Sequence, residues 1–262
     1  MKRDSDKAVP DNWLELLNER CDLDQSFAAL EGWNHFHTDT IRGRIRYMQL
    51  RPREAWAHFD QALSRSAGFD GLRNILRRFY LKIYRFENAL LDESLPEGGD
   101  PASTEACLQE ILHGDTPNSE MVRQFRLLTI GTYLLHQQNY AAAKNLLLRV
   151  IHESEMTAGD EKTGFYLAAA AAHRGLGENS DADRQLENAC LSIPALDNTF
   201  NMGLYSSIVH ALLRIWGRDQ EAGEWEEFLL RLKLPPKTLE IFRERSRRIV
   251  ERSSNLHRIF LF

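Results

Sequence analysis

The sequence predicts an all-α protein built as an array of helix pairs. Leu, Ala, Arg and Glu dominate the 262 residues, while only eight prolines and fifteen glycines are present, a composition that favours helices over strands. Similar paired segments recur, with anchor alanines 39 and 40 residues apart at Ala143, Ala182 and Ala222. No alternation of polar and apolar residues competes with this pattern. Recurrence at such a period is typical of stacked helical repeats, which are binding surfaces more often than catalysts.

The chain is expected to open with a polar segment and one clear helix pair. Residues 1–10 are predicted to be disordered, and a first helix is predicted to begin near Asp11 as its N-cap. The first clear pair combines a helix over about 33–50 with one over about 52–66. Pro52 suits the first turn of the second helix, where its missing N–H costs nothing.

An irregular unit follows this pair. A long helix is predicted over about 70–93, and a loop insertion at 94–103 follows because two prolines and two glycines there break any helix. A short helix over about 104–112 returns from the loop. The gap of 88 residues between Ala55 and Ala143 would hold two units. One of them contains this loop insertion.

Three further pairs and a cap complete the prediction. The pairs are expected over about 119–155, 162–192 and 199–232. Within the middle one, five consecutive alanines allow a neighbouring helix to approach closely, Gly177 ends the first helix and Pro194 stops the second. Residues 236–262 form the cap, with a basic helix over about 237–252.

The paired units resemble the tetratricopeptide repeat. The best match is the unit at 166–194, which carries Tyr166, Gly177, Ala182, Leu186, Ala189 and Pro194. Units around Gly43 and Gly131 match in part, and the unit at Gly217 is degenerate. The resemblance implies a right-handed superhelix, an α-solenoid of about five antiparallel pairs. It would form a single domain over 11–262, with an N-terminal helix and a C-terminal cap.

The same resemblance implies a binding groove, because the first helix of each pair lines the concave face of such arrays. The positions that line this groove follow by offset from the residues that match the repeat. The residues in the middle of the groove are apolar, and arginines lie among or beyond them. The groove residues are Arg44, Tyr47, Phe125, Leu128, Leu135, Leu167, Arg174, Leu204 and Arg214. An apolar trough with arginines suits an amphipathic helix or a peptide with acidic flanks. The alternative is that a neighbouring helix or a second subunit covers these leucines.

The function expected is that of a non-catalytic adaptor or regulatory scaffold that binds another protein. No phosphate loop, nucleophile motif or metal-ligand spacing is present, so neither a cofactor nor a metal is expected. His35 and His37 would face different sides of a helix, which argues against a shared ion. The net charge of −5 gives no reason to expect nucleic acid as an obligatory partner.

Three widely spaced cysteines, a polar N-terminus and the lack of an apolar run of about 18–20 residues predict a cytoplasmic protein without membrane insertion. Two other functions stay open. The basic helix over 237–252 could bind the phosphates of nucleic acid, although glutamates are interleaved with its arginines. The apolar residues 259–262 could fold back over the last pair, or they could join two copies as a homodimer in a self-associating structural module.

Overall fold

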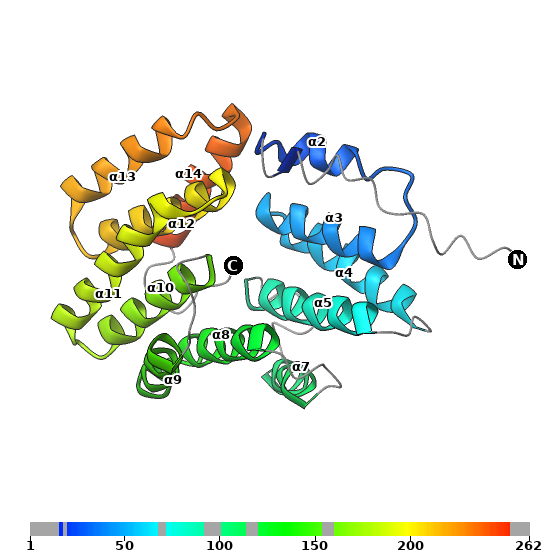
Figure 1. Cartoon of the computed structure of the whole chain (residues 1–262), viewed down its shortest axis with the longest axis horizontal. Helices are drawn as coiled ribbons and strands as arrows, with labels where there is room; N and C mark the ends of the chain where they lie inside the picture. The colour runs from blue at the N-terminus through cyan, green and yellow to red at the C-terminus, as the bar shows by residue number, and fades with distance from the viewer. Residues whose placement is uncertain are drawn as a thin grey trace, which may run out of the picture. The chain divides into compact units, whose positions relative to one another are not determined.

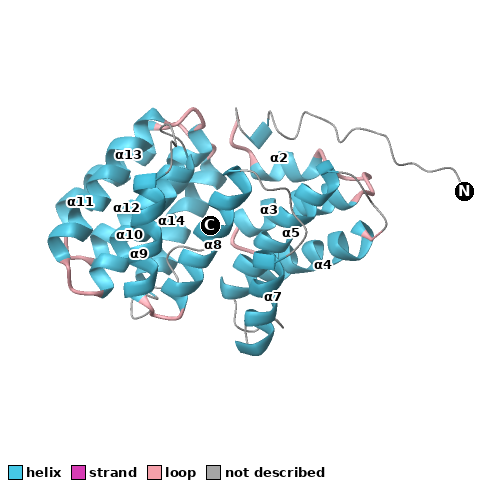
Figure 2. Ribbon diagram, turned by 60° about the horizontal axis from the view of Figure 1, so that its bottom comes forward, coloured by secondary structure: helices cyan, strands magenta, loops and turns pink. Residues whose placement is uncertain are grey.

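Helices account for almost all of the structure. The computed structural model describes residues 16–17, 20–67, 72–91, 101–113, 120–153 and 160–251. Within these ranges adjacent helices pack as pairs and no strand occurs (Figure 2), which confirms the predicted all-α class. The chain forms two compact units, residues 1–122 and residues 123–262.

The first unit contains the one clear pair predicted in the N-terminal half. Its helices are α2 (Leu23–Ala28), α3 (Phe36–Met48), α4 (Pro52–Ser66), α5 (Leu72–Leu91) and α7 (Pro101–His113). Helix α3 packs on α4, and α4 packs on α5 (Figure 1). Pro52 stands at the first position of α4, as expected from its missing N–H.

Capping residues explain where this unit differs from the prediction. Helix α3 begins three residues later than expected because the Nδ1 atom of His35 accepts a hydrogen bond from the backbone N–H of His37 at 3.1 Å. Helix α2 was not predicted; the Asp22 carboxylate caps it by accepting from the Gln25 N–H at 2.9 Å. The loop predicted at 94–103 is wrong for its last three residues, because Pro101 begins α7.

Some predictions fall on residues that the structure does not describe. They are the disordered segment at 1–10, the start of a helix at Asp11, the loop over 94–100 and the apolar segment within 252–262.

The second unit contains the three predicted C-terminal pairs. They are α8 (Glu120–His136) with α9 (Tyr140–Glu153), α10 (Asp160–Gly175) with α11 (Asn179–Ser192), and α12 (Thr199–Ile215) with α13 (Asp219–Arg231). A one-turn 3-10 helix, Ile193–Ala195, contains Pro194 and follows α11 directly. The last helix, α14 (Pro236–Glu251), packs against α12 (Figure 1).

Four turns between paired helices share one conformation. In each, a residue with φ between 57° and 75° follows the first helix; these residues are Leu50, Gln138, Gly177 and Gly217. The next residue donates its backbone N–H to the carbonyl five residues earlier, at 2.8–3.0 Å, which is the long hydrogen bond of a Schellman motif. Five residues after each positive φ comes a fully buried alanine: Ala55, Ala143, Ala182 or Ala222. The predicted register of the anchor alanines is therefore confirmed.

Three of the four pairs are also closed by a contact at fixed repeat positions. In these three, a small residue stands seven residues before the positive φ, and a large apolar residue stands nine residues after it. The first three pairs hold Gly43 with Phe59, Gly131 with Leu147, and Ala170 with Leu186. A Cβ atom at Gly131 would lie only 2.7 Å from Leu147 Cδ2, so the two helices pack too closely there for a side chain at residue 131. In the fourth pair the same positions hold His210 and Glu226.

The alanine run of α10 lies at the centre of the second unit. None of the residues from Ala168 to Ala172 is more than 1% exposed. Because these side chains are short on every side of the helix, both α9 and α11 pack closely on α10. The run therefore provides the close packing that the sequence predicts.

Candidate functional site

The groove residues predicted in the first unit have different surroundings. The guanidinium carbon of Arg44 lies 4.5 Å from the centre of the Tyr84 ring on α5, with the arginine itself exposed. Tyr47 is only 8% exposed and belongs to a core cluster with Ala55 and Phe59. Tyr47 therefore leaves little surface that a partner could contact.

The predicted leucines of the second unit divide into two groups. Leu135 and Leu167 are fully buried in the core formed by α8 to α12, so they leave no surface for a partner. Leu128 and Leu204 are partly buried and pack at the edge of this core. Phe125 lies on α8, where the structure describes its backbone but not its side chain. Of the four predicted leucines, Leu128 and Leu204 are the two that keep surface that a partner could contact.

The two predicted arginines of this unit stand near the ends of first helices. Arg174 donates from Nη1 to the Asn179 side chain at 2.7 Å, and its guanidinium lies 5.1 Å from the centre of the Trp216 ring. Arg214 lies 3.4 Å from the carboxylate of Asp219, and half of its side chain is exposed. Cations at helix C-termini are favoured by the helix dipole. Each arginine retains further N–H donors for a partner.

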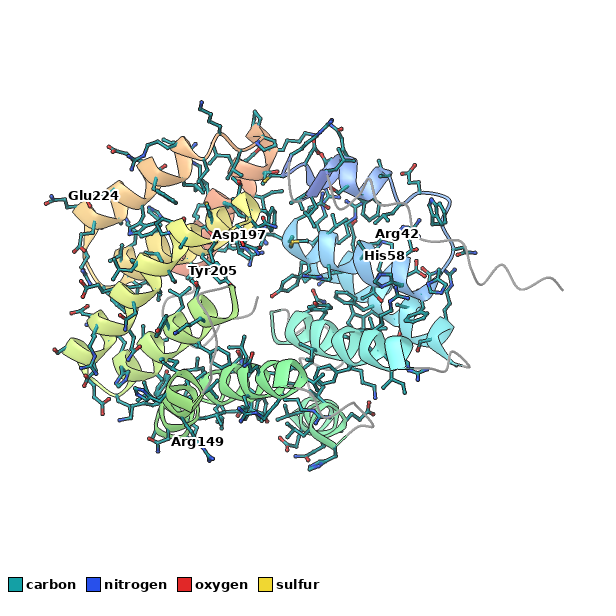
Figure 3. All side chains as sticks on the ribbon, in the orientation of Figure 1. Arg42, His58, Arg149, Asp197, Tyr205 and Glu224 are labelled. Atoms are coloured by element: carbon teal, nitrogen blue, oxygen red, sulfur yellow. The ribbon has the colours of Figure 1, made fainter. Side chains whose placement is uncertain are left out.

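Three first helices of the second unit meet around Gly164 on α10. A Cβ atom there would lie 3.8 Å from the Tyr205 hydroxyl on α12 and 3.9 Å from Leu128 Cδ2 on α8. Figure 3 shows Tyr205 where α12 approaches α10. Leu204 occupies in α12 the repeat position that Gly164 holds in α10. We define the first-helix face as Leu128, Gly164, Leu204 and Tyr205.

A pocket of about 630 Å³ lies beside this face, between α12, α13 and α14. It opens at the fourth pair, where His210 and Glu226 replace the small and large apolar residues of the other pairs. Its lining contains both charged and apolar side chains. They are Ser207, His210, Arg214, Glu226, Leu229, Phe242, Arg243, Ser246, Arg247, Val250 and Glu251.

Hydrogen bonds fix the polar wall of the pocket. The Nδ1 atom of His210 lies 2.6 Å from the hydroxyl oxygen of Ser246 on α14. Arg243 donates from Nη2 to a carboxylate oxygen of Glu226 at 3.0 Å. Burial lowers the pKa of His210, and the nearby Arg214 lowers it further, while Glu226 acts in the opposite direction. These surroundings therefore favour the neutral imidazole.

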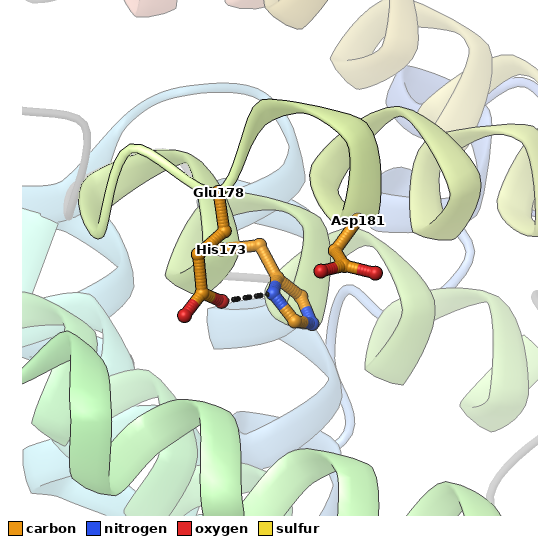
Figure 4. Close-up of side chains that lie close together, drawn as sticks. All are labelled: His173, Glu178 and Asp181. Carbon is orange, nitrogen blue, oxygen red and sulfur yellow. Dashed lines mark hydrogen bonds and ion pairs between the residues drawn. The ribbon is translucent and has the colours of Figure 1, made fainter.

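A second polar cluster joins α9 to the turn between α10 and α11. His173 Nδ1 lies 2.6 Å from one carboxylate oxygen of Glu178 (Figure 4). Lys144 of α9 donates to the other oxygen at 2.7 Å. Asp181 lies nearby, so that one ligand atom from each acidic residue and one from His173 fall within 4.8 Å of one another. Lys144 already supplies a cation to Glu178, and Asp181 pairs with Arg184 at 2.7 Å. The cluster therefore connects two neighbouring pairs through an ion-pair network.

The arginines of α14 are held by glutamates. Arg243 pairs with Glu226, and Arg247 pairs with Glu244 at 2.6 Å and with Glu251. These pairs place negative charge next to each of the two cations. The basic helix therefore presents a mixed surface, in contrast to the continuous positive stripe typical of phosphate-binding helices.

Comparison of the chain with protein-family models, with curated proteins and with solved structures gives no match. Across the described ranges, the helices are too short or too polar for any of them to span a lipid bilayer.

Sequence reasoning missed both the pocket and the His173 cluster. A signal for the pocket was present, since the fourth pair departs from the apolar repeat pattern at positions 210 and 226. The cluster depends on Lys144, which lies on a different pair from His173 and Glu178. Nothing in the spacing of these three residues predicts their contact.

Proposed function

We propose that this chain is a non-catalytic protein-interaction module that binds an apolar segment of another protein through the first-helix face. The observation that supports it is the shared turn, in which a positive φ and a buried anchor alanine recur at fixed offsets in four pairs. Arrays with such a register hold equivalent helices side by side as an extended binding surface. A tetratricopeptide-like superhelix of about five pairs is the architecture that continues this register.

The chemistry of the accessible residues favours a partner with apolar anchors and acidic flanks. Leu128 and Leu204 offer apolar surface at the edge of the core, without the burial that removes Leu135 and Leu167. Arg174 and Arg214 provide cations at the ends of two of the same helices. An amphipathic helix or an extended peptide with leucine-like anchors and carboxylates would match both features.

A cytoplasmic location is part of this proposal. Burial raises the pKa of the Cys190 thiol to about 12, which keeps the sulfur protonated. Cys21 is buried and Cys190 is partly buried, and burial also raises the pKa of the Cys21 thiol. Protonated thiols suit a reducing compartment.

The test is affinity capture from the native cell with wild-type protein and with the double variant Leu128→Glu/Leu204→Glu, followed by quantitative mass spectrometry. The matched control is Leu191→Glu/Leu230→Glu, because these leucines of α11 and α13 are 71% and 48% exposed. Circular dichroism and thermal melting establish that each variant is folded.

The expected result is a partner recovered with wild type and with the control but lost with the Leu128/Leu204 variant. Equal recovery of every partner by a folded Leu128/Leu204 variant would overturn the assignment of the first-helix face.

A further inference from the structure

We propose that the pocket between α12, α13 and α14 binds a monocarboxylate carried on an apolar body. This site is separate from the first-helix face and requires no protein partner. The ligand class follows from three features of the pocket: how the repeat creates it, what charge its wall carries and what its apolar side can hold.

The pocket exists because the fourth pair abandons the apolar contact that closes the other three. Phe59, Leu147 and Leu186 occupy the large position in those pairs, whereas the fourth pair has Glu226 there, with its carboxylate directed to Arg243 on α14. The small position holds His210, whose ring bonds Ser246. Both side chains therefore turn to α14, and about 630 Å³ remains among the three helices. Ligand sites of proteins commonly have this volume.

The charge on the wall favours one negative charge on the ligand. Three cations, Arg214, Arg243 and Arg247, line the pocket, and each is paired with a carboxylate. The pair of Arg214 with Asp219 is the longest of these, at 3.4 Å, so Arg214 is the guanidinium that a ligand carboxylate would take over. One guanidinium matches a single negative charge, whereas a phosphate dianion would meet repulsion from Glu226 and Glu251, which also line the pocket.

Arginine donors are available for the carboxylate. A guanidinium has five N–H donors, and Arg243 uses its Nη2 atom for Glu226. Arg214 is the least tightly paired of the three lining arginines, since its pair with Asp219 is long at 3.4 Å, and half of its side chain is exposed. A bidentate bond from an arginine to a carboxylate is the strongest neutralising contact that this wall can make.

The opposite side of the pocket suits an apolar body. Phe242 and Leu229 border the pocket but are only 1% and 4% exposed, so Val250 on α14, which is partly exposed, supplies the accessible apolar surface beside them. A phenyl ring or a branched aliphatic chain would pack against Val250 at this side of the pocket. A carboxylate and an apolar body are combined in small aryl or alkyl carboxylic acids and in the free C-terminal residue of a peptide.

The experiment is a titration of the full chain with matched acids and amides by isothermal calorimetry, with two-dimensional NMR to locate the site. The small-molecule arm compares 4-phenylbutyrate with 4-phenylbutyramide, and the peptide arm compares N-acetyl-Gly-Phe with its C-terminal amide. The proposal expects the acid of at least one arm to bind and its amide to bind at least tenfold more weakly. The arm with the tighter acid identifies the source of the carboxylate.

Variants that change the charge of the pocket in opposite directions test where the carboxylate of the ligand binds. Arg214→Gln is expected to weaken binding of the acid about tenfold, and Glu226→Gln is expected to strengthen it, since one removes a donor and the other removes a repelling charge. Arg184→Gln is the matched control, because this 65%-exposed arginine of α11 lies outside the pocket lining. Leu128→Glu/Leu204→Glu should leave acid binding unchanged, so failure of the first-helix face and failure of the pocket are distinguishable.

Three results would overturn the proposal: equal binding of acid and amide in both arms, no binding of either acid at millimolar concentration, or the same affinity in Arg214→Gln, Glu226→Gln and wild type. Tighter binding of inorganic phosphate than of both acids would overturn the choice of a monoanion.

Discussion

Gly131 on α8 lies directly against Leu147 on α9, so that a Cβ atom at residue 131 would be 2.7 Å from Leu147 Cδ2. Leu147 is fully buried, so its side chain can shift only against its neighbours in the core. Gly131→Ala is therefore expected to be less stable than Gly223→Ala by roughly 1–3 kcal/mol. Residue 223 is helical and a Cβ atom there would meet no other atom within 4 Å, so this control carries the same gain in helix propensity without the overlap. Urea unfolding of both variants measures the difference, and equal stabilities would contradict the close approach.

The shared turn predicts that substitutions at two equivalent positions change the free energy of unfolding in opposite directions. Gly177 has φ +75° and Gln138 has φ +57°, both in the left-handed region. Gly177→Ala is expected to lower the free energy of unfolding by roughly 1–2 kcal/mol, because a Cβ atom is strained there. Gln138→Gly is expected to raise it by about 0.5–1 kcal/mol, because it relieves the same strain. Thermal unfolding of the two variants checks the signs, and a change of the same sign in both would refute the equivalence of the turns.

A buried ion network holds the first unit. The carboxylate of Asp39 is fully buried and pairs with Arg65 at 2.6 Å and with Arg42 at 3.1 Å. Asp39→Ala leaves both arginines without this partner and is expected to cost about 3 kcal/mol, at the lower end of values for buried pairs because Arg65 is one-third exposed.

Asp60→Ala is the control for Asp39→Ala, since Asp60 pairs with Arg85 at the surface. Its expected cost is below about 1 kcal/mol. Chemical denaturation compares the two, and similar losses would show that the Asp39 network has no special role.

The cluster around Glu178 predicts a pH dependence. Hydrogen bonds from Lys144 and His173 lower the pKa of Glu178 in the folded state. A carboxyl whose pKa is lowered by folding stabilises the protein above its ordinary pKa, about 4.3, and this contribution is lost as pH falls through the lowered value. Wild type should therefore melt above Glu178→Gln at pH 7, and the difference in melting temperature should shrink as the pH falls below about 4.3. A melting difference that persists unchanged at low pH would exclude the ion pair as its cause.

Much of the fold could be predicted because helix pairs are specified locally. Pro52 marks the start of α4, Gly177 and Gly217 mark two turns, and the anchor alanines fix the register. The starts of α3 and α7 were harder to predict, because a histidine cap and a helix-initial proline are weaker signals than a run of apolar residues.

The candidate site was harder to predict than the fold. An offset from a repeat identifies which side of a helix a residue occupies, but not how much of that side the neighbouring helices cover. Leu128 and Leu167 hold the same repeat position, yet Leu167 lies on the central helix of its unit and is fully enclosed. The pocket depends on contacts of α12 and α13 with α14, which follows the last repeat and has no repeat position of its own.

The shared turn also bears on how the chain acquires its structure. Its hydrogen bonds join residues at most five positions apart, and the contact that closes a pair, such as Gly131 with Leu147, spans sixteen. Loops of this size close in well under a millisecond, whereas a ribosome adds only about 5–20 residues each second. Each pair can therefore close soon after its second helix leaves the exit tunnel, so synthesis itself sets the order of assembly from the N-terminus onward.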